Sequence, residues 1–474
     1  MLDNYIDNLK DEIIEKTRSV IQIPSVYSDI NTPSIPFGKN VNDALEYVLN
    51  LGKNLGFRTK NLDGYCGYIE FGEGKEMLGI IGHLDVVPEG EGWTYPPFSA
   101  TIHDGKIFGR GSIDDKSAVI ASLYAMKAVM DNCKVDKRVR LILGLNEERD
   151  WKCIKHYKES EEMPDIAFSP DADFPCIYAE KSILNCSISS NYFENENSNI
   201  IIKEIDCNNN ALNVVPKICT ATLVSNNNNI FIDELIKFIK SKIHTNKFEI
   251  EVLKLNTNEI KLISHGIQAH GAHPDLGINA ISRLIIILNE IFRFCNEKNE
   301  ILDFFNKYIN TDYYGKNLGL NFEDESGKLT LNVGAFSFEN SKLEIKMNIR
   351  IPVTINPNRI IQRFIELCNL YKNLSFKKID LANALYIPKN NKLVSTLCNI
   401  FNDYTNSNYE PVAIGGGTYA KAFKNCISFG PNFPGRKDMC HQTDEFIEID
   451  NLILCSKIYA KAILELASKD FKIQ

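Results

Sequence analysis

Apolar residues recur at two different periods along the first part of the chain. Ile6, Leu9, Ile13 and Val20 are spaced as on one face of a helix, which predicts a helix over residues 3–21. Other segments are apolar without interruption, as expected of strands whose two faces are both buried. The same patterns predict further helices at residues 42–55 and 115–129 and strands at residues 66–71, 77–87, 139–145 and 166–169.

Helices alternate with these buried strands, an order that is typical of an α/β fold. We therefore predict a mostly parallel mixed sheet flanked by helices. Acidic residues follow the ends of two of its strands, at residues 147–148 and 171–173. In open sheets of this kind the functional site lies beyond the carboxyl ends of the strands, so these acidic residues are candidates for its chemistry.

The amino-acid composition of the chain changes after about residue 183. Residues 191–210 and 225–229 are rich in asparagine, which is typical of surface loops or insertions. We expect residues 184–383 to form a second α/β domain inserted into the first, which would consist of residues 1–183 and 384–474. Within these parts the patterns predict helices at residues 231–243, 279–296, 392–401 and 452–466 and short strands at residues 259–264 and 328–335.

Composition excludes several classes of protein. A formal net charge of −8 argues against a nucleic-acid-binding surface, and no apolar run reaches the length of a membrane span. The first residues are polar and acidic, unlike a signal peptide. Thirteen cysteines without Cys-x-x-Cys pairing are typical of reduced thiols. We therefore expect a cytoplasmic protein in which the cysteines are small core residues, and we give Cys440 no role.

The densest motif lies between residues 82 and 116. His83 and Asp85 are two residues apart at the predicted end of a strand, where this spacing puts both on one face. A histidine that binds a metal usually donates its other ring N–H to a carboxylate, and Asp85 suits that task. Asp114 follows in a glycine-bounded turn before a helix, which can hold its carboxylate rigidly.

Five side chains at predicted strand ends or glycine turns of the first domain suit two zinc ions. Catalytic zinc takes histidine nitrogen and carboxylate oxygen, and a pair of ions needs a bridging carboxylate. Taken alone, each residue is more often an ordinary core histidine or a solvated carboxylate, and only the shared setting favours a metal site. Glu147 has no metal to hold and is free to be a general base. The five are His83, Asp114, Glu148, Asp171 and His441.

With these motifs the chain resembles the two-zinc aminoacylase and carboxypeptidase family of metallopeptidases, and within it the PepV-type dipeptidases. The resemblance covers nearly the whole chain. Departures at Ser117, Arg149–Asp150, Ser182 and Lys217 leave the substrate range open. The matching segments are GHLDVVP (82–88), GRGSIDDK (109–116), EE (147–148), SPDA (169–172) with FP (174–175), GGGTYA (415–420) and FPGR through HQ (433–442).

The resemblance assigns roles in the metal site. It implies that His83 and Asp171 hold one zinc and that Glu148 and His441 hold the other, with Asp114 bridging and manganese or cobalt as substitutes in vitro. It also implies that Asp85 orients His83 and that Glu147 is the base. The peptide bond between the two aspartates at 114 and 115 is expected to be cis.

The resemblance also assigns roles in substrate binding. Residues 267–274 resemble the segment whose histidine, His270 here, stabilises the oxyanion. Residues 211–216 and 348–353 resemble segments that hold substrate. Arg350 would bind the substrate's C-terminal carboxylate, because arginine matches a carboxylate with two hydrogen bonds. Asn213, Gly415, Gly416 and Gly417 complete the expected substrate site.

These features imply a zinc-dependent dipeptidase that cleaves dipeptides with a free C-terminal carboxylate, through a metal-bridging hydroxide activated by Glu147. One alternative is a deacylase of N-acyl amino acids, such as the acetyl or succinyl derivatives. Another is a non-catalytic protein that binds metal and peptide, although such a protein has no use for Glu147. The size of the inserted lid favours a monomer, as in PepV-type dipeptidases.

Overall fold

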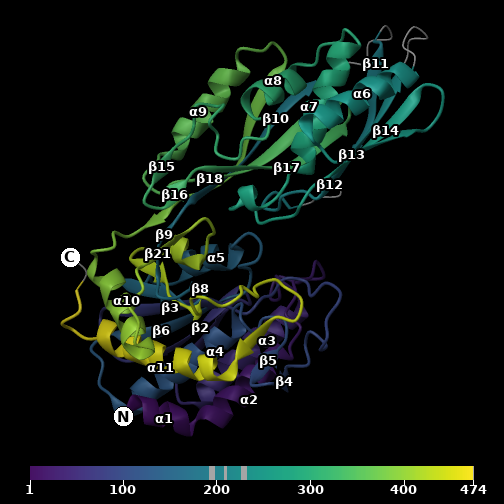
Figure 1. The fold of residues 1–474 in the computed structure, drawn as a ribbon. Coiled ribbons are helices and arrows are strands. Elements are labelled where there is room, and N and C mark those ends of the chain that lie inside the picture. Colours follow the sequence, from purple (N-terminus) through teal and green to yellow (C-terminus); the bar gives the residue numbers. More distant parts are fainter. Residues whose placement is uncertain (192–197, 208–210, 226–231, 473–474) are drawn as a thin grey trace. The chain divides into compact units, whose positions relative to one another are not determined.

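The structure is a computed structural model that describes residues 1–191, 198–207, 211–225 and 232–472. It divides into two compact units. The discontinuous unit comprises Met1–Ala179 and Leu385–Gln474, and the inserted unit comprises Glu180–Ala384. Figure 1 shows the ribbon of both units.

The discontinuous unit is built on a nine-stranded mixed sheet. Its four central strands are parallel, because β3 pairs in parallel with β6 and β7, and β22 with β7. Antiparallel pairs flank them on both sides. The predicted mostly parallel mixed sheet is confirmed. In spatial order the strands are β1 (Arg58–Leu62), β2 (Cys66–Phe71), β6 (Arg138–Gly144), β3 (Met77–His83), β7 (Ile166–Ser169), β22 (Cys426–Ser428), β9 (Ile177–Glu180) and β20 (Leu385–Tyr386), with β21 (Val412–Ile414) paired to β9.

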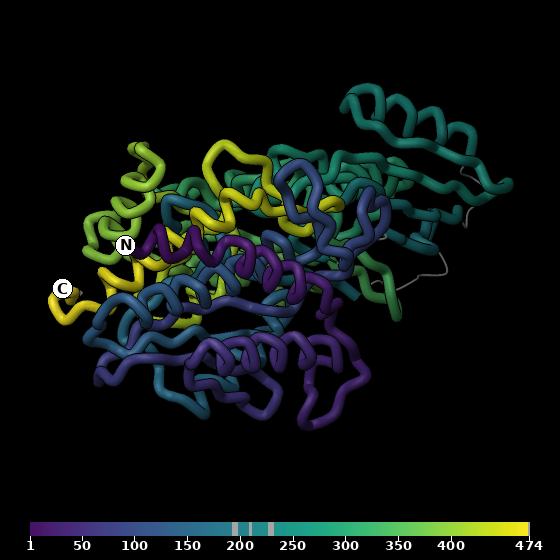
Figure 2. The backbone as a smooth tube through the Cα atoms, turned by 90° about the horizontal axis from the view of Figure 1, so that it is seen from below, coloured from purple at the N-terminus to yellow at the C-terminus, as the bar shows by residue number. Residues whose placement is uncertain are grey.

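Helices from both ends of the chain pack against this sheet and one another. The helix α4 (Lys116–Asn132) is buried on nearly every side, since it lies between β3 and β6 and the helices α2 and α11. Figure 2 shows the first helices, in purple, next to the yellow C-terminal part of the chain. The others are α1 (Leu2–Asn8), α2 (Lys10–Ile21), α3 (Lys39–Asn54), α5 (Lys152–Ser160), α10 (Lys392–Thr405) and α11 (Ile449–Leu466).

Two sequence predictions in this unit need correction. The single helix predicted over residues 3–21 is broken at Leu9, whose backbone (φ −97°, ψ 4°) leaves helical geometry. The strand predicted over residues 77–87 ends at His83. After His83 the chain leaves the sheet, and Val86 forms an isolated bridge with Val26 instead.

Short strands hold the loops that follow the central sheet. The pairs are β8 (Ala172–Asp173) with β23 (Pro431–Asn432), and β5 (Lys106–Phe108) with both β4 (Thr101–His103) and β24 (Phe446–Glu448). β8 begins directly after Asp171, and all of the pairs except β4 with β5 join segments that are far apart in sequence.

The inserted unit contains two four-stranded sheets in which every neighbouring pair is antiparallel. Helices cover them and share one apolar core with both. One sheet is β17 (Thr330–Glu339), β18 (Lys342–Ile351), β10 (Ser182–Asn191) and β19 (Leu374–Ala382), and the other is β11 (Ile200–Asp206), β12 (Ile218–Ser225), β14 (Glu259–His265) and β13 (Ile250–Lys254). The helices are α6 (Ile232–Asn246), α7 (Ala280–Phe294), α8 (Glu300–Tyr308) and α9 (Pro357–Cys368), and β15 (Glu323–Asp324) pairs with β16 (Gly327–Lys328).

The asparagine-rich stretches only partly match the predicted loops. Residues 192–197, 208–210 and 226–231 lie outside the described residues, and so does the predicted start of the helix at residue 231. Between the first two stretches the chain forms β11, in which Ile200 and Ile202 are buried in the core. The loop prediction was wrong there.

The cysteines follow the sequence prediction except for one pair. Eleven are free, and nine of these are buried, as expected of small core residues. Cys207 and Cys219 form a disulfide, so the prediction of reduced thiols throughout was wrong. The pairing of Asp206 with Thr220 brings the two cysteines opposite each other, with their Cα atoms 4.0 Å apart.

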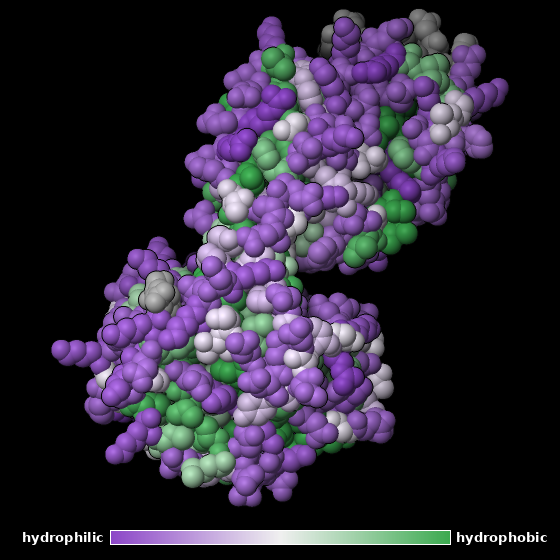
Figure 3. All heavy atoms as spheres, turned by 60° about the vertical axis from the view of Figure 1, so that its left-hand side comes forward, coloured by the Kyte–Doolittle hydropathy of each residue, from purple (hydrophilic) through white to green (hydrophobic). Residues whose placement is uncertain are grey.

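The surface is largely polar. Figure 3 shows a face on which hydrophilic residues predominate and apolar ones are scattered. Within the described parts of the chain, no helix combines the length and apolar character that a bilayer crossing requires.

We predict that Asn279→Ala destabilises the inserted unit by about 2–3 kcal/mol, because it leaves buried polar groups unpaired. Asn279 is 2% exposed. It caps α7 by accepting from the Ser282 N–H (3.0 Å) and donates to the Val333 carbonyl (2.8 Å). Urea unfolding followed by circular dichroism measures the change. Asn356→Ala removes the exposed cap of α9 and should cost about 1 kcal/mol; an equal loss in both variants would contradict the burial argument.

Candidate metal centre

His83 is the last residue of β3, a strand whose residues are all buried. Its main-chain N–H donates to the Asp115 carboxylate (3.1 Å). Its Nδ1 lies 2.9 Å from the main-chain oxygen of Asp85, so Nε2 is left for the site. Nε2 lies 2.9 Å from Oδ1 of Asp114 and 3.7 Å from Oδ1 of Asp171.

Asp85 holds two parts of the site, in a way that differs from the sequence prediction. It lies in the loop after β3 rather than on the strand, and its main-chain oxygen is the nearer partner of the His83 ring. The carboxylate is 3.5 Å from the same nitrogen. Instead, its two oxygens accept from the main-chain N–H groups of Glu147 and Glu148, both at 3.1 Å. Asp85 therefore orients the histidine and the two glutamates together.

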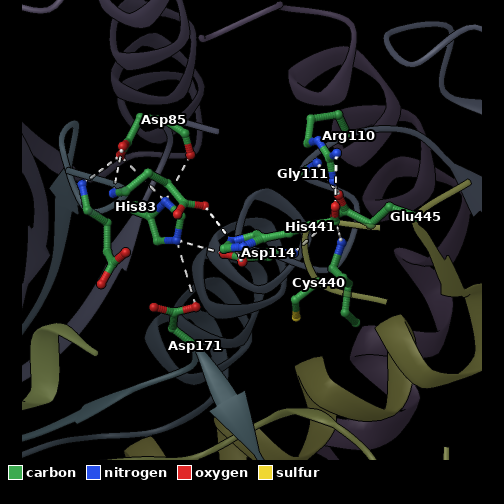
Figure 4. Close-up of polar contacts among 12 residues, drawn as sticks. His83, Asp85, Arg110, Gly111, Asp114, Asp171, Cys440, His441 and Glu445 are labelled. Carbon is green, nitrogen blue, oxygen red and sulfur yellow. Dashed lines mark hydrogen bonds and ion pairs between the residues drawn. The ribbon is translucent and has the colours of Figure 1, made fainter. Parts of the chain in front are cut away.

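A second group of ligands meets the first at Asp114. The Nε2 atom of His441 lies 3.0 Å from Oε1 of Glu148 and 3.1 Å from Oδ2 of Asp114. Asp114 thus turns one oxygen to each histidine, and Figure 4 shows it between the two rings. The peptide bond between Asp114 and Asp115 is cis, as the resemblance predicted. Among the residues that the structure describes, two groups could hold a metal ion: His83, Asp114 and Asp171, and Asp114, Glu148 and His441.

Burial acts to raise the pKa of the Asp114, Glu147 and Asp171 carboxylates, and the histidines oppose it to different degrees. Burial and neighbouring acidic groups raise the pKa of Asp171 to about 6. Burial and the charge of Asp171 hold the pKa of Glu147 well above its ordinary value. Burial raises the pKa of Asp114, but hydrogen bonds from both histidines outweigh it and the pKa is lowered.

The pKa values of the two histidines are also raised, by their acidic neighbours. Partial burial lowers the pKa of His441, but hydrogen bonds to Asp114 and Glu148 outweigh it and raise this pKa to about 11. Burial lowers the pKa of His83, yet the charge of Asp171 and its hydrogen-bonded carboxylates leave it well above its ordinary value. A divalent cation bound here would need both rings neutral, so it would compete with protons for them. Imidazole nitrogen and carboxylate oxygen are donors that suit zinc, so the residues fit such ions.

Both ligand groups open on a cavity of about 150 Å³. Glu147 also lines it without belonging to either group. Of the predicted glycines, Gly417 lines the cavity, and Gly415 and Gly416 precede it in the loop after β21. Cys440, to which sequence reasoning gave no role, is part of the wall.

Sequence reasoning also missed the buried side chains behind the ligands. Tyr419 follows the glycines, and its hydroxyl lies 2.8 Å from Sγ of Cys153 and accepts from the Asn146 N–H (3.4 Å). Its ring packs edge-to-face against His83. The tyrosine could have been identified from the GGGTYA motif, of which only the glycines were assigned a role. An ion pair between Arg110 and Glu445 was missed as well.

The remaining predicted residues belong to the inserted unit. Asn213 and His270 lie on two paired loops: the Asn213 carbonyl accepts from the Gly271 N–H (2.6 Å), and Val214 bridges to His270. Arg350 is 4% exposed on β18, and its Nε donates to Oδ1 of Asn348 (2.8 Å). Burial lowers the pKa of Arg350 to about 10.

Comparison with known proteins places this chain among peptidases. The model of peptidase family M20/M25/M40 matches residues 79–465. A relative from Bacillus subtilis named "Putative dipeptidase YtjP" is 38% identical over 469 residues, covering 97% of this chain and 98% of the relative. A "Putative dipeptidase" of Staphylococcus epidermidis is 33% identical over 468 residues, with the same coverage of 97% and 98%.

Solved structures agree on the fold. The di-peptidase Dug1p of Saccharomyces cerevisiae has a TM-score of 0.58 at 13% identity, covering 99% of this chain and 98% of that one. Human carnosine dipeptidase 1 has a TM-score of 0.57 at 14% identity, covering 98% of this chain and 99% of that one. The family match spans most of the sequence and confirms the resemblance carried by the motifs. The chain belongs to peptidase family M20/M25/M40 and is a metallopeptidase.

Proposed function

We propose that this protein is a zinc-dependent dipeptidase acting on dipeptides with a free C-terminal carboxylate. The observation that carries the proposal is the pair of ligand groups sharing Asp114, with Glu147 beside them on the same cavity. The dipeptidase names of relatives that match almost end to end support this choice of substrate. We also propose a cytoplasmic location, which the eleven free cysteines support and the Cys207–Cys219 disulfide opposes.

The ligand assignment follows the two groups. His83 and Asp171 would hold one zinc, Glu148 and His441 the other, and Asp114 both. When bound, such ions act as Lewis acids that polarise the scissile carbonyl and lower the pKa of water. Both histidines present Nε2, and the main-chain oxygen of Asp85 fixes the other nitrogen of His83.

Glu147 is the group left to move protons. As a carboxylate it would accept a proton from the attacking water, and as an acid it would return that proton to the leaving amine. Burial raises its pKa, which favours holding the proton between the two steps. The bond from its main-chain N–H to Asp85 fixes its position (3.1 Å).

The inserted unit would bind the substrate. His270 would donate a hydrogen bond to the developing oxyanion, an interaction that stabilises the transition state more than the ground state. Arg350 would bind the C-terminal carboxylate, helped by Asn213 and by the loop of Gly415, Gly416 and Gly417. The paired loops of Asn213 and His270, and the bond from the Thr330 hydroxyl beside Arg350 to the Ala272 carbonyl (3.2 Å), support a common role.

We predict that Glu147→Gln lowers kcat by roughly 10²–10⁴-fold while leaving zinc binding intact, because the amide accepts no proton. Elemental analysis of protein purified without chelator should still find close to two zinc ions per chain. Glu159→Gln, at an exposed position of α5, is the matched control and should change neither value. A Glu147→Gln variant that keeps most of its kcat would assign the base to another residue.

We predict that dipeptides are cleaved faster than their C-terminal amides and than N-acetyl or N-succinyl amino acids. Amides should be poorer because they lack the carboxylate that Arg350 would bind. N-acyl amino acids keep this carboxylate, and they should be poorer because the relatives are named dipeptidases. Steady-state kinetics with zinc or manganese measure the preference, and Arg350→Ala should reduce kcat/KM for the acids more than for the amides. Faster turnover of the N-acyl amino acids would identify a deacylase instead.

We predict that the active species is a monomer, because one chain contains a complete inserted unit. Light scattering at assay concentration should give the mass of one chain. Mixing the inactive variants His270→Ala and Glu147→Ala should leave the sample inactive. Restored activity would mean that His270 acts on a second chain.

A further inference from the structure

Glu445 is a fully buried glutamate that binds the loop carrying Asp114. Its Oε1 accepts from the main-chain N–H groups of Ile113 (2.8 Å) and Asp114 (3.2 Å). Its Oε2 accepts from the N–H of Gly111 (3.1 Å) and from Nη1 of Arg110 (2.7 Å). Figure 4 shows this carboxylate turned towards Arg110 and Gly111. One side chain therefore fixes the backbone from Gly111 to Asp114.

Arg110, itself 2% exposed, binds the loop carrying the other ligand. Its Nη2 donates to the main-chain oxygen of His441 (3.4 Å), and its Nη1 to that of Gln442 (3.2 Å). Nη2 also reaches the main-chain oxygen of Glu89, in the loop that follows Asp85 (3.2 Å). The guanidinium thus ties together three loops of the metal centre.

His441 needs such support from its backbone. Its side chain is 51% exposed, so packing around the ring does little to fix it. Its φ of 63° lies in the left-handed region, which is unfavourable for a residue other than glycine. The bond from Arg110 to its main-chain oxygen, together with Glu445 four positions later, holds the backbone in this conformation.

The pair is poorly explained as a device for stability alone. A buried ion pair contributes little net stability, because desolvation of two charges opposes their attraction. The same unit contains a second pair of this kind, Arg140 with Glu70, at 2.7 Å and with side chains 3% and 8% exposed. Its further contacts go to Arg58, Arg138, Tyr157, Glu161 and Glu162, and in the described parts of the chain none goes to a metal-site loop. The Arg140–Glu70 pair can therefore be compared with the Arg110–Glu445 pair within one unit.

We propose that Arg110 and Glu445 are positioning residues that hold Asp114 and His441 at the separation that a shared metal ion needs. The inference rests on the ligand set of the proposed function and is independent of which amide bond is cleaved. Atoms beyond the direct ligands typically change metal affinity by about 10–100-fold when they are altered.

The test is zinc titration of metal-free protein, by calorimetry against a competing chelator. Glu445→Gln replaces one acceptor oxygen by an N–H group that faces donors. We expect the affinity for one of the two zinc ions to fall by about 10–100-fold. The activity lost at low zinc should return at saturating zinc. Glu70→Gln, the matched control, should lower the melting temperature and leave both zinc affinities unchanged.

Other outcomes separate the possible errors. Unchanged zinc affinities in Glu445→Gln, with a lower melting temperature as in Glu70→Gln, would make the pair structural and overturn the inference. If Glu445→Gln fails to fold, Arg110→Lys keeps the charge but loses the two-pronged donor; it should weaken zinc binding too, and wild-type affinity in it would overturn the inference. Wild-type protein that binds two zinc ions but cleaves no dipeptide would overturn the proposed function alone.

Discussion

Asp114, Glu147, Glu148 and Asp171 line one small cavity, where their negative charges repel one another with little water to screen them. Two histidines lie among them, each with Nε2 within 3.0 Å of a carboxylate oxygen. The loops around the cavity resist this repulsion through bonds to the main chain. Asp85 binds the glutamate loop, Asp115 the end of β3, and Glu445 the turn before α4. Three acidic residues behind the cluster thus fix the backbone that carries its ligands.

The core sheet and the ligand set were accessible from the sequence because local patterns encode them. Residues 66–71 and 166–169 were predicted as strands with their observed bounds, and nearly all of their residues are buried. The ligands follow such strands or glycine turns, so their positions in the sequence already indicated a common edge. All five predicted ligands fall into the two groups that meet at Asp114.

What the sequence did not reveal depends on contacts between distant segments. Asp85 was assigned to His83 from its spacing, but its carboxylate binds amides some sixty residues away. Arg110 and Glu445 meet only when the second part of the discontinuous unit folds onto the first. The antiparallel pairing of the inserted unit and the Cys207–Cys219 disulfide depend on which strands become neighbours, which the local apolar pattern of each strand does not show.

The position of β22 has a consequence for the order in which this protein can assemble. β22 pairs with β7 on one side and β9 on the other, although the whole inserted unit separates it from both in the chain. During synthesis β7 therefore lacks its neighbour β22 until the whole inserted unit has left the ribosome. His441 arrives later still. The first ligand group is encoded before the insertion and the second is completed only after it, so the two groups come together only once the second part of the discontinuous unit has been made.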